Sequence, residues 1–192
     1  RKAGVWVVGL GVVYAILFVV SGSWHYFLIA NPVIPVLVGD CLIQRQTVCR
    51  GANLETAELR RANLSHARLN MANLEGANLW HANLSYADLE GANLSYANLR
   101  ATDLTGANLR GANLEGALMD NANMAGSDLS AAHLGGVILT GADLGLAKLA
   151  KADLEGAYLE GVNLKGADLS EARLIAGQLG GSDLQGANLR GA

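Results

Sequence analysis

The hydrophobic and polar residues of this chain follow two different patterns, which meet near residue 40. Residues 3–39 contain no Asp, Glu, Lys or Arg, and most of them are apolar. From residue 54 to residue 189, Leu or Met instead occupies every fifth position, 28 times in succession. Because the two patterns bury side chains in different ways, they predict two separate structural segments.

The first segment is long and apolar enough to cross a lipid bilayer. Residues 4–20 are uncharged and mostly apolar, and the apolar stretch continues to Ala30. A helix of about 20 residues spans a bilayer. We therefore expect a transmembrane α-helix within residues 1–31, with residues 4–30 in contact with lipid.

A linker follows the predicted helix. Pro32 and Pro35 forbid a regular continuation of the helix, so residues 32–50 are expected to form a linker and an N-terminal cap for the second segment. Two alternatives to a single helix stay open. One is a hairpin of two short segments broken at residues 21–23, and the other is a retained secretory signal.

The five-residue period of the second segment fits neither an α-helix nor a flat β-strand. Two residues before each Leu or Met the side chain is small, and it is Ala in 22 of the 28 repeats. On an α-helix, five residues advance about 500°, so successive Leu side chains would circle the helix. On a flat strand they would alternate between the two faces. The pattern therefore predicts a chain that bends once per repeat and coils around its own Leu column.

The other positions of the repeat suit such a bend. The residue before each Leu or Met is Asn or Asp in 19 of the 28 repeats, and these side chains support tight turns through local hydrogen bonds. Gly is frequent at the fifth position, where it relieves backbone crowding. The predicted interior includes Leu54, Leu74, Leu109, Met119, Met124, Leu144, Leu164 and Leu189.

The repeat resembles a known family. The pentads ANLEG at residues 72–76 and ANLRG at residues 107–111 define the motif A-(N/D)-L-x-x. With 28 unbroken copies of it, the chain from residue 52 onward resembles the pentapeptide-repeat family. The resemblance implies a β fold, namely a right-handed quadrilateral β-helix with four repeats per coil. Residues 51–192 would then form a solenoid of about seven coils.

With four repeats per coil, residues twenty apart should stack on one face. One such row carries large apolar residues in three successive coils, namely Leu118, Ile138 and Tyr158. An exposed apolar stripe often marks a contact surface, so these are candidate partner-binding residues; the alternative is drift at a tolerant surface position. Trp80 is a further candidate, because aromatic and histidine residues gather in the first coils: His66, Trp80, His81, Tyr86 and Tyr96.

The two cysteines, Cys41 and Cys49, lie just before the repeats. Outside the cytoplasm they could form a disulfide. Cys49 also falls in the same five-residue phase as the Leu column, so it could instead cap the first coil as a buried thiol. Both alternatives stay open.

Composition and charge exclude several classes of function. The formal net charge of −3 offers no basic stripe for nucleic acid. Acidic residues recur because the repeat places polar residues outward, and a Leu-filled interior offers no obvious cleft for a substrate. We therefore expect no enzyme activity, catalytic residue, metal, cofactor, nucleic acid or small-molecule substrate.

These features favour a non-enzymatic, membrane-anchored scaffold or accessory subunit that docks protein partners of a membrane complex on flat solenoid faces. Arg1 and Lys2 precede the apolar segment, so the positive-inside rule places the solenoid on the periplasmic or lumenal side. Two alternatives belong to other classes. One is duplex-DNA mimicry at a topoisomerase, as for some members of the resembled family. The other is an accessory domain of a channel or transporter with further chain upstream.

Overall fold

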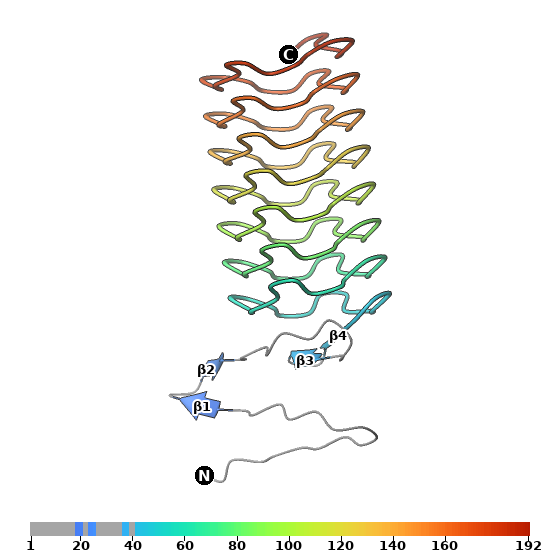
Figure 1. The fold of residues 1–192 in the computed structure, drawn as a ribbon, viewed down its shortest axis with the longest axis vertical. Helices are drawn as coiled ribbons and strands as arrows, with labels where there is room; N and C mark the ends of the chain where they lie inside the picture. Colours follow the sequence, from blue (N-terminus) through green and yellow to red (C-terminus); the bar gives the residue numbers. More distant parts are fainter. Residues whose placement is uncertain (1–17, 21–22, 26–35, 39–40) are drawn as a thin grey trace.

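The computed structural model describes residues 18–20, 23–25, 36–38 and 41–192 (Figure 1). Short strands lie toward the N-terminal end, and the remaining described chain forms a tall stack of coils. The strands form two antiparallel pairs, β1 with β2 and β3 with β4. Their bounds are β1 Phe18–Val20, β2 Ser23–His25, β3 Val36–Val38 and β4 Cys41–Ile43.

Four pentads make one complete coil from Val48 onward. Parallel β-bridges join residues twenty apart, from Val48 with Arg68 to Asp168 with Asn188. The bridged residues form four rows, which are the four faces of the stack (Figure 1). This arrangement confirms the predicted coiled backbone. It begins one pentad earlier than expected, because Cys49 takes the position that Leu or Met holds in later pentads.

Each pentad contains a tight turn with one left-handed residue. In the first Leu pentad, Ala57 donates its N–H to the Leu54 carbonyl at 3.1 Å, and Thr56 between them has a φ of 53°. The corresponding residues from Gln46 to Gly191 all have positive φ, and 15 are glycine and 15 are not. Since this conformation costs about 1–2 kcal/mol for an L residue, the backbone explains the frequent glycine.

Backbone and side-chain hydrogen bonds join successive coils. Leu54 donates its N–H to the Asn73 carbonyl at 2.7 Å, and Asn73 donates its N–H to the Ala52 carbonyl at 2.9 Å. The Asn73 side chain donates from Nδ2 to Oδ1 of Asn53 at 3.3 Å and accepts the Glu75 N–H at 3.2 Å. Asn at this position therefore serves both the local turn and the contact between coils.

The interior is filled by the Leu or Met and the small residue of each pentad. Between residues 54 and 169, no Leu or Met of the column exposes more than 1% of its surface. Leu189 differs, because it is 44% exposed. The prediction of a buried Leu189 is wrong, since no described coil packs on its outer side. The buried residues among those predicted are Leu54, Leu74, Leu109, Met119, Met124, Leu144 and Leu164.

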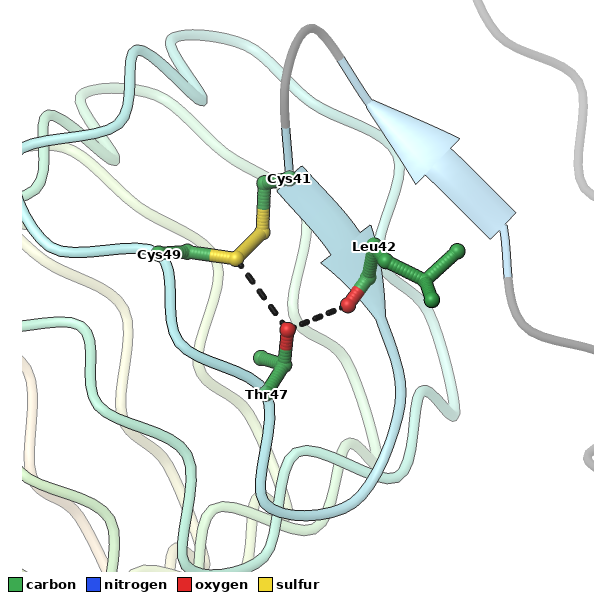
Figure 2. Close-up of a disulfide and its surroundings, with 4 residues drawn as sticks. All are labelled: Cys41, Leu42, Thr47 and Cys49. Atoms are coloured by element: carbon green, nitrogen blue, oxygen red, sulfur yellow. Dashed lines mark hydrogen bonds between the residues drawn. A yellow bond between two sulfur atoms is a disulfide. The ribbon is translucent and has the colours of Figure 1, made fainter.

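The N-terminal end of the solenoid is joined to strand β4 by a disulfide (Figure 2). Cys41 and Cys49 are bonded, with their Cα atoms 5.3 Å apart, and they expose only 1% and 5% of their surfaces. The Thr47 hydroxyl donates to the Leu42 carbonyl and lies 3.2 Å from Sγ of Cys49. The pair is therefore both cross-linked and buried at the entrance to the first coil.

The predicted transmembrane helix overlaps the described residues only in part. Within residues 1–31 the described residues are β1 and β2, which pair antiparallel with Val20 opposite Ser23. The helix prediction is wrong for these six residues. Val, Phe and Trp are enriched in strands, which agrees with the short strands found at these residues.

The remaining residues of the predicted helix lie outside the described ones. In the part of the chain that the structure describes, no helix has the length and apolar character needed to cross a membrane.

Candidate functional site

One face of the solenoid carries a continuous apolar stripe, which we define as Leu118, Ile138 and Tyr158. Parallel bridges join Leu118 to Ile138 and Ile138 to Tyr158, so the three residues stack in successive coils. Leu118 and Ile138 are half-buried, and Tyr158 is 42% exposed. The structure thus brings together the three residues that the twenty-residue spacing singled out.

Polar residues surround the apolar stripe. Asn98 and Gln178 continue the same row at its two ends. Beside it, Thr140 donates its hydroxyl to the Glu160 carboxylate at 3.5 Å. A small apolar centre surrounded by a polar rim is the usual composition of a non-obligate protein–protein interface.

The structure places Trp80 away from the apolar stripe. The row that passes through Asn78 reaches Leu118 two coils later, and Trp80 lies at the corner beside Asn78. The guanidinium carbons of Arg60 and Arg61 lie 4.8 and 5.4 Å from the centroid of the Trp80 ring. Sequence reasoning missed this contact, although the twenty residues from Arg60 to Trp80 equal one coil and could have revealed it.

The other aromatic and histidine residues of the first coils form separate contacts. The rings of His66 and Tyr86 stack with their centroids 5.3 Å apart, while His81 meets Trp80 edge-on at 4.3 Å. Tyr86 and Tyr96 expose 59% and 62% of their surfaces. These residues are therefore distributed around the coil and do not form one cluster.

A hollow of about 500 Å³ lies on another side of the solenoid, between Tyr96 and Glu155. Gly135 leaves a gap there between Glu115 in the coil before it and Glu155 in the coil after it. Glu155 is paired with the Arg173 guanidinium at 2.6 Å. Within the described residues, no three His, Cys, Asp or Glu side chains are placed to hold a metal ion. The hollow thus offers acidic groups without a metal-ligating set.

A further row carries charges of both signs. Burial raises the pKa of the Asp128 carboxyl, but hydrogen bonds from Ser130 and the positive charges of Lys148 and Arg110 outweigh it, so the pKa lies below its ordinary value. Nζ of Lys148 lies 3.6 Å from the Asp128 carboxylate. Asp128 is therefore charged and is compensated by a base one coil away.

Comparison with known proteins identifies the repeat. The family described as Pentapeptide repeats (8 copies) matches the chain over more than half of its 192 residues. None of the curated proteins compared with the chain matches it. The segments matched by the family are residues 45–76, 72–111, 97–136, 107–145, 127–166 and 152–191.

Several solved structures are similar. HetL, a pentapeptide repeat protein involved in heterocyst differentiation regulation from the cyanobacterium Nostoc sp. strain PCC 7120, is 32% identical, with a TM-score of 0.41, over 76% of this chain and 77% of that one. A pentapeptide repeat protein from the Arabidopsis thaliana thylakoid lumen is 30% identical, with a TM-score of 0.40, over 54% of this chain and 66% of that one.

A more distant structure is QnrB1, a plasmid-mediated fluoroquinolone resistance protein. It is 23% identical, with a TM-score of 0.35, over 72% of this chain and 78% of that one. The family match covers the same residues that form the stacked coils. The chain therefore belongs to the pentapeptide-repeat family, and its repeats form a right-handed β-helix.

Proposed function

We propose that this protein is a non-enzymatic, membrane-anchored scaffold or accessory subunit that docks a protein partner on the flat faces of its solenoid. The observation that carries the proposal is the apolar stripe, where Leu118, Ile138 and Tyr158 stack on one face. Stacked coils form a rigid wall, and solenoids commonly bind partners along such extended surfaces.

The apolar stripe suits a protein partner. Its residues are held by hydrogen-bonded coils, so binding requires little ordering of the backbone. Tyr158 combines an exposed aromatic ring with a polar hydroxyl, and Tyr is among the residues enriched at interface hot spots. The polar ends of the row, Asn98 and Gln178, limit the apolar area. The expected partner presents a small apolar patch of its own.

The arrangement of charges favours protein docking over mimicry of duplex DNA. A DNA mimic requires rows of uncompensated carboxylates, as in a phosphate backbone. Here Asp120 pairs with Arg100 at 2.9 Å, and Asp153 pairs with Arg173 at 3.0 Å. Such exposed pairs contribute only about 0–1 kcal/mol each to stability, yet each one neutralises the carboxylate that it contacts.

The membrane anchor is a separate part of the proposal and rests on composition. Residues 4–30 contain no charged residue, a composition that favours lipid over water. The disulfide between Cys41 and Cys49 supports a periplasmic or lumenal position of the solenoid. Disulfides persist in oxidising compartments and are rare in the cytosol.

Docking is tested by affinity purification from gently solubilised membranes with the full chain as bait. Leu118→Asp combined with Tyr158→Asp places two charges on the apolar stripe and leaves the interior intact, so we expect normal folding and about a tenfold loss of recovered partner. Asn73→Asp combined with Asn113→Asp is the matched control, since it adds two charges with the same spacing on another row. Unchanged recovery with the stripe variant, or an equal loss with the control, would reject the stripe.

The anchor is tested on membranes isolated from cells that express the full chain. We expect the chain to stay in the membrane pellet during alkaline extraction. We also expect a maleimide reagent to label Cys41 and Cys49 only after reduction. Release into the alkaline supernatant would overturn the anchor. Labelling without reduction would overturn the periplasmic or lumenal placement.

A further inference from the structure

Charge is distributed unevenly along the solenoid. Residues 41–70 contain five arginines and two glutamates, a net charge of +3. Residues 71–192 contain seven basic and fourteen acidic residues, a net charge of −7. The N-terminal end of the rod is therefore basic and the rest is acidic, a separation that the net charge of the whole chain conceals.

The positive charge belongs to exposed arginines around the first coil. In the described part of the chain none of these arginines forms a salt bridge, whereas five of the seven basic residues after residue 70 do. Their positions in the twenty-residue register place them at three corners and one face, so they surround the coil. We define this group as the basic collar: Arg45, Arg50, Arg60, Arg61 and Arg68.

Trp80 positions two members of the basic collar. The guanidinium groups of Arg60 and Arg61 both lie within cation–π distance of its ring, at 4.8 and 5.4 Å from the centroid. This contact uses the face of the ring and leaves guanidinium N–H groups free to donate. A guanidinium matches phosphate through paired hydrogen bonds, so the two side chains are preorganised for an anionic ligand.

We propose that the basic collar binds the phosphate groups of anionic phospholipids at the surface of the membrane that residues 4–30 enter. This inference deepens the proposed function and rests on its membrane attachment. The collar lies in the coils that directly follow the apolar segment in sequence. Its charge is complementary to an anionic lipid surface, which attracts basic groups placed next to a membrane anchor.

The charge separation suits a flat surface better than a nucleic acid. The row from Val48 to Asn188 contains seven steps between coils, which correspond to about 34 Å at the usual strand spacing. Screening in physiological salt acts over about 8 Å. A rod standing end-on can therefore touch lipid with its basic collar while most of its acidic coils stay beyond the surface potential. A long duplex lying along the rod would meet the acidic coils as well.

The test is flotation of the full chain with vesicles of phosphatidylcholine alone and of phosphatidylcholine mixed with phosphatidylglycerol. We expect stronger binding to the mixed vesicles, with the preference lost at high salt. Arg60→Gln combined with Arg61→Gln should weaken that binding by about fivefold for each arginine removed. Lysine at both positions should restore only the part of this binding that depends on charge. Lys148→Gln combined with Lys151→Gln removes equal charge from the acidic coils and should have no effect.

The outcomes separate this inference from the proposed function. Equal binding to both vesicle types would overturn the collar and leave the anchor standing. Salt-sensitive binding to the mixed vesicles alone would support the collar and overturn the anchor. An equal loss in the Lys148 and Lys151 control would overturn the collar. So would binding of labelled duplex DNA as tight as binding to the mixed vesicles. Circular-dichroism melts should match the wild type for every variant, because all the substituted side chains are exposed.

Discussion

The interior coils and the last coil are built from the same pentad, yet they bury it differently. Leu74, in an interior coil, is fully buried, whereas Leu189, in the last coil, exposes 44% of its surface. Both residues hold the same position of the repeat, two residues after an alanine. Among the described coils, Leu74 has a neighbouring coil on each side and Leu189 has one on one side only. The repeat therefore determines which side chains point into the solenoid, and the neighbouring coils determine whether those side chains are buried.

The N-terminal end shows that an end coil can also be covered by other means. Cys49 holds the Leu position there and is only 5% exposed. Val38 and Ile43 from the hairpin of β3 and β4 belong to the same apolar cluster and are 4% and 6% exposed. The disulfide to Cys41 fastens this hairpin to the coil. The first coil is thus covered by the hairpin of β3 and β4, whereas Leu189 in the last described coil is exposed.

The largest expected effect comes from placing a charge in an interior coil. Leu109 is 0% exposed, and an unpaired buried charge lowers the free energy of unfolding by about 4 kcal/mol. We expect Leu109→Asp to abolish the cooperative circular-dichroism melt. Leu189→Asp should lower the melting temperature only slightly, because this side chain already meets water. An undisturbed melt of Leu109→Asp, or equal damage from both variants, would contradict the comparison.

Removal of the N-terminal cover should have the next largest effect. The disulfide between Cys41 and Cys49 closes a short loop, and its loss should lower the local free energy of unfolding by about 2.5 kcal/mol. In Cys41→Ala combined with Cys49→Ala, hydrogen exchange should accelerate in residues 45–60 and stay unchanged in residues 175–192. Reduction of the wild-type chain should reproduce this pattern and leave the variant unaffected. Unchanged exchange in residues 45–60 would mean that packing alone closes this end.

A smaller effect is expected from substitutions of glycine at the corners of the coils, where the chain turns. Gly106 and Gly111 have φ values of 63° and 60°. A Cβ at Gly106 would lie 2.6 Å from the Tyr86 ring, and one at Gly111 would have no neighbour within 4 Å. Both alanine variants should lose about 1 kcal/mol of stability through the backbone. Gly106→Ala should lose about 0.5 kcal/mol more, because the ring must leave its rotamer.

Chemical denaturation of both glycine variants measures this difference. In a Tyr86→Ala background the two glycine substitutions should become equally destabilising, because the neighbouring ring is gone. Equal effects in the wild-type background would show that contacts between coils at the corners contribute nothing.

The smallest expected effect concerns pH and the attachment of the last coil. Hydrogen bonds from the hydroxyl and N–H of Ser170 lower the pKa of Asp168, and Nδ2 of Asn188 in the last coil also donates to this carboxylate, at 2.8 Å. Because the folded pKa lies below the unfolded one, the carboxylate stabilises the fold fully above about pH 4. That stabilisation is lost as the pH falls through the folded value.

Melting temperatures recorded from neutral pH down to about pH 3 test this carboxylate. The decrease should be smaller for Asp168→Asn than for the wild type, because the asparagine does not titrate. Identical decreases would exclude Asp168 as a source of acid sensitivity.

The solenoid could be predicted because its core signal is strictly periodic. With 28 pentads and no insertion, the position of every side chain follows from a single register. The same register predicts that Leu118, Ile138 and Tyr158 share one face, and the parallel bridges confirm it. A residue's place in the stack was therefore predictable wherever the repeat alone decides it.

The features that the sequence left open or missed depend on neighbours outside the repeat. The strands β1 and β2 have three residues each, and strands this short depend on what packs against them more than on intrinsic preference. The exposure of Leu189 depends on how many coils pack against it, which its own pentad cannot encode. The contact of Arg60 and Arg61 with Trp80 depends on rotamers across two coils. The pairing of Cys41 with Cys49 required the distance that only the folded hairpin supplies.

A turn of twenty residues has a consequence for changes in chain length. Loss of a single pentad between Leu118 and Ile138 would rotate every later residue by a quarter turn, so Ile138 and Tyr158 would leave the row that they share with Leu118. Loss of twenty consecutive residues would shorten the rod by one level and keep every row aligned. Length variation in whole turns of twenty residues would therefore preserve the apolar stripe. Variation by single pentads would rearrange the stripe, although the interior would remain buried.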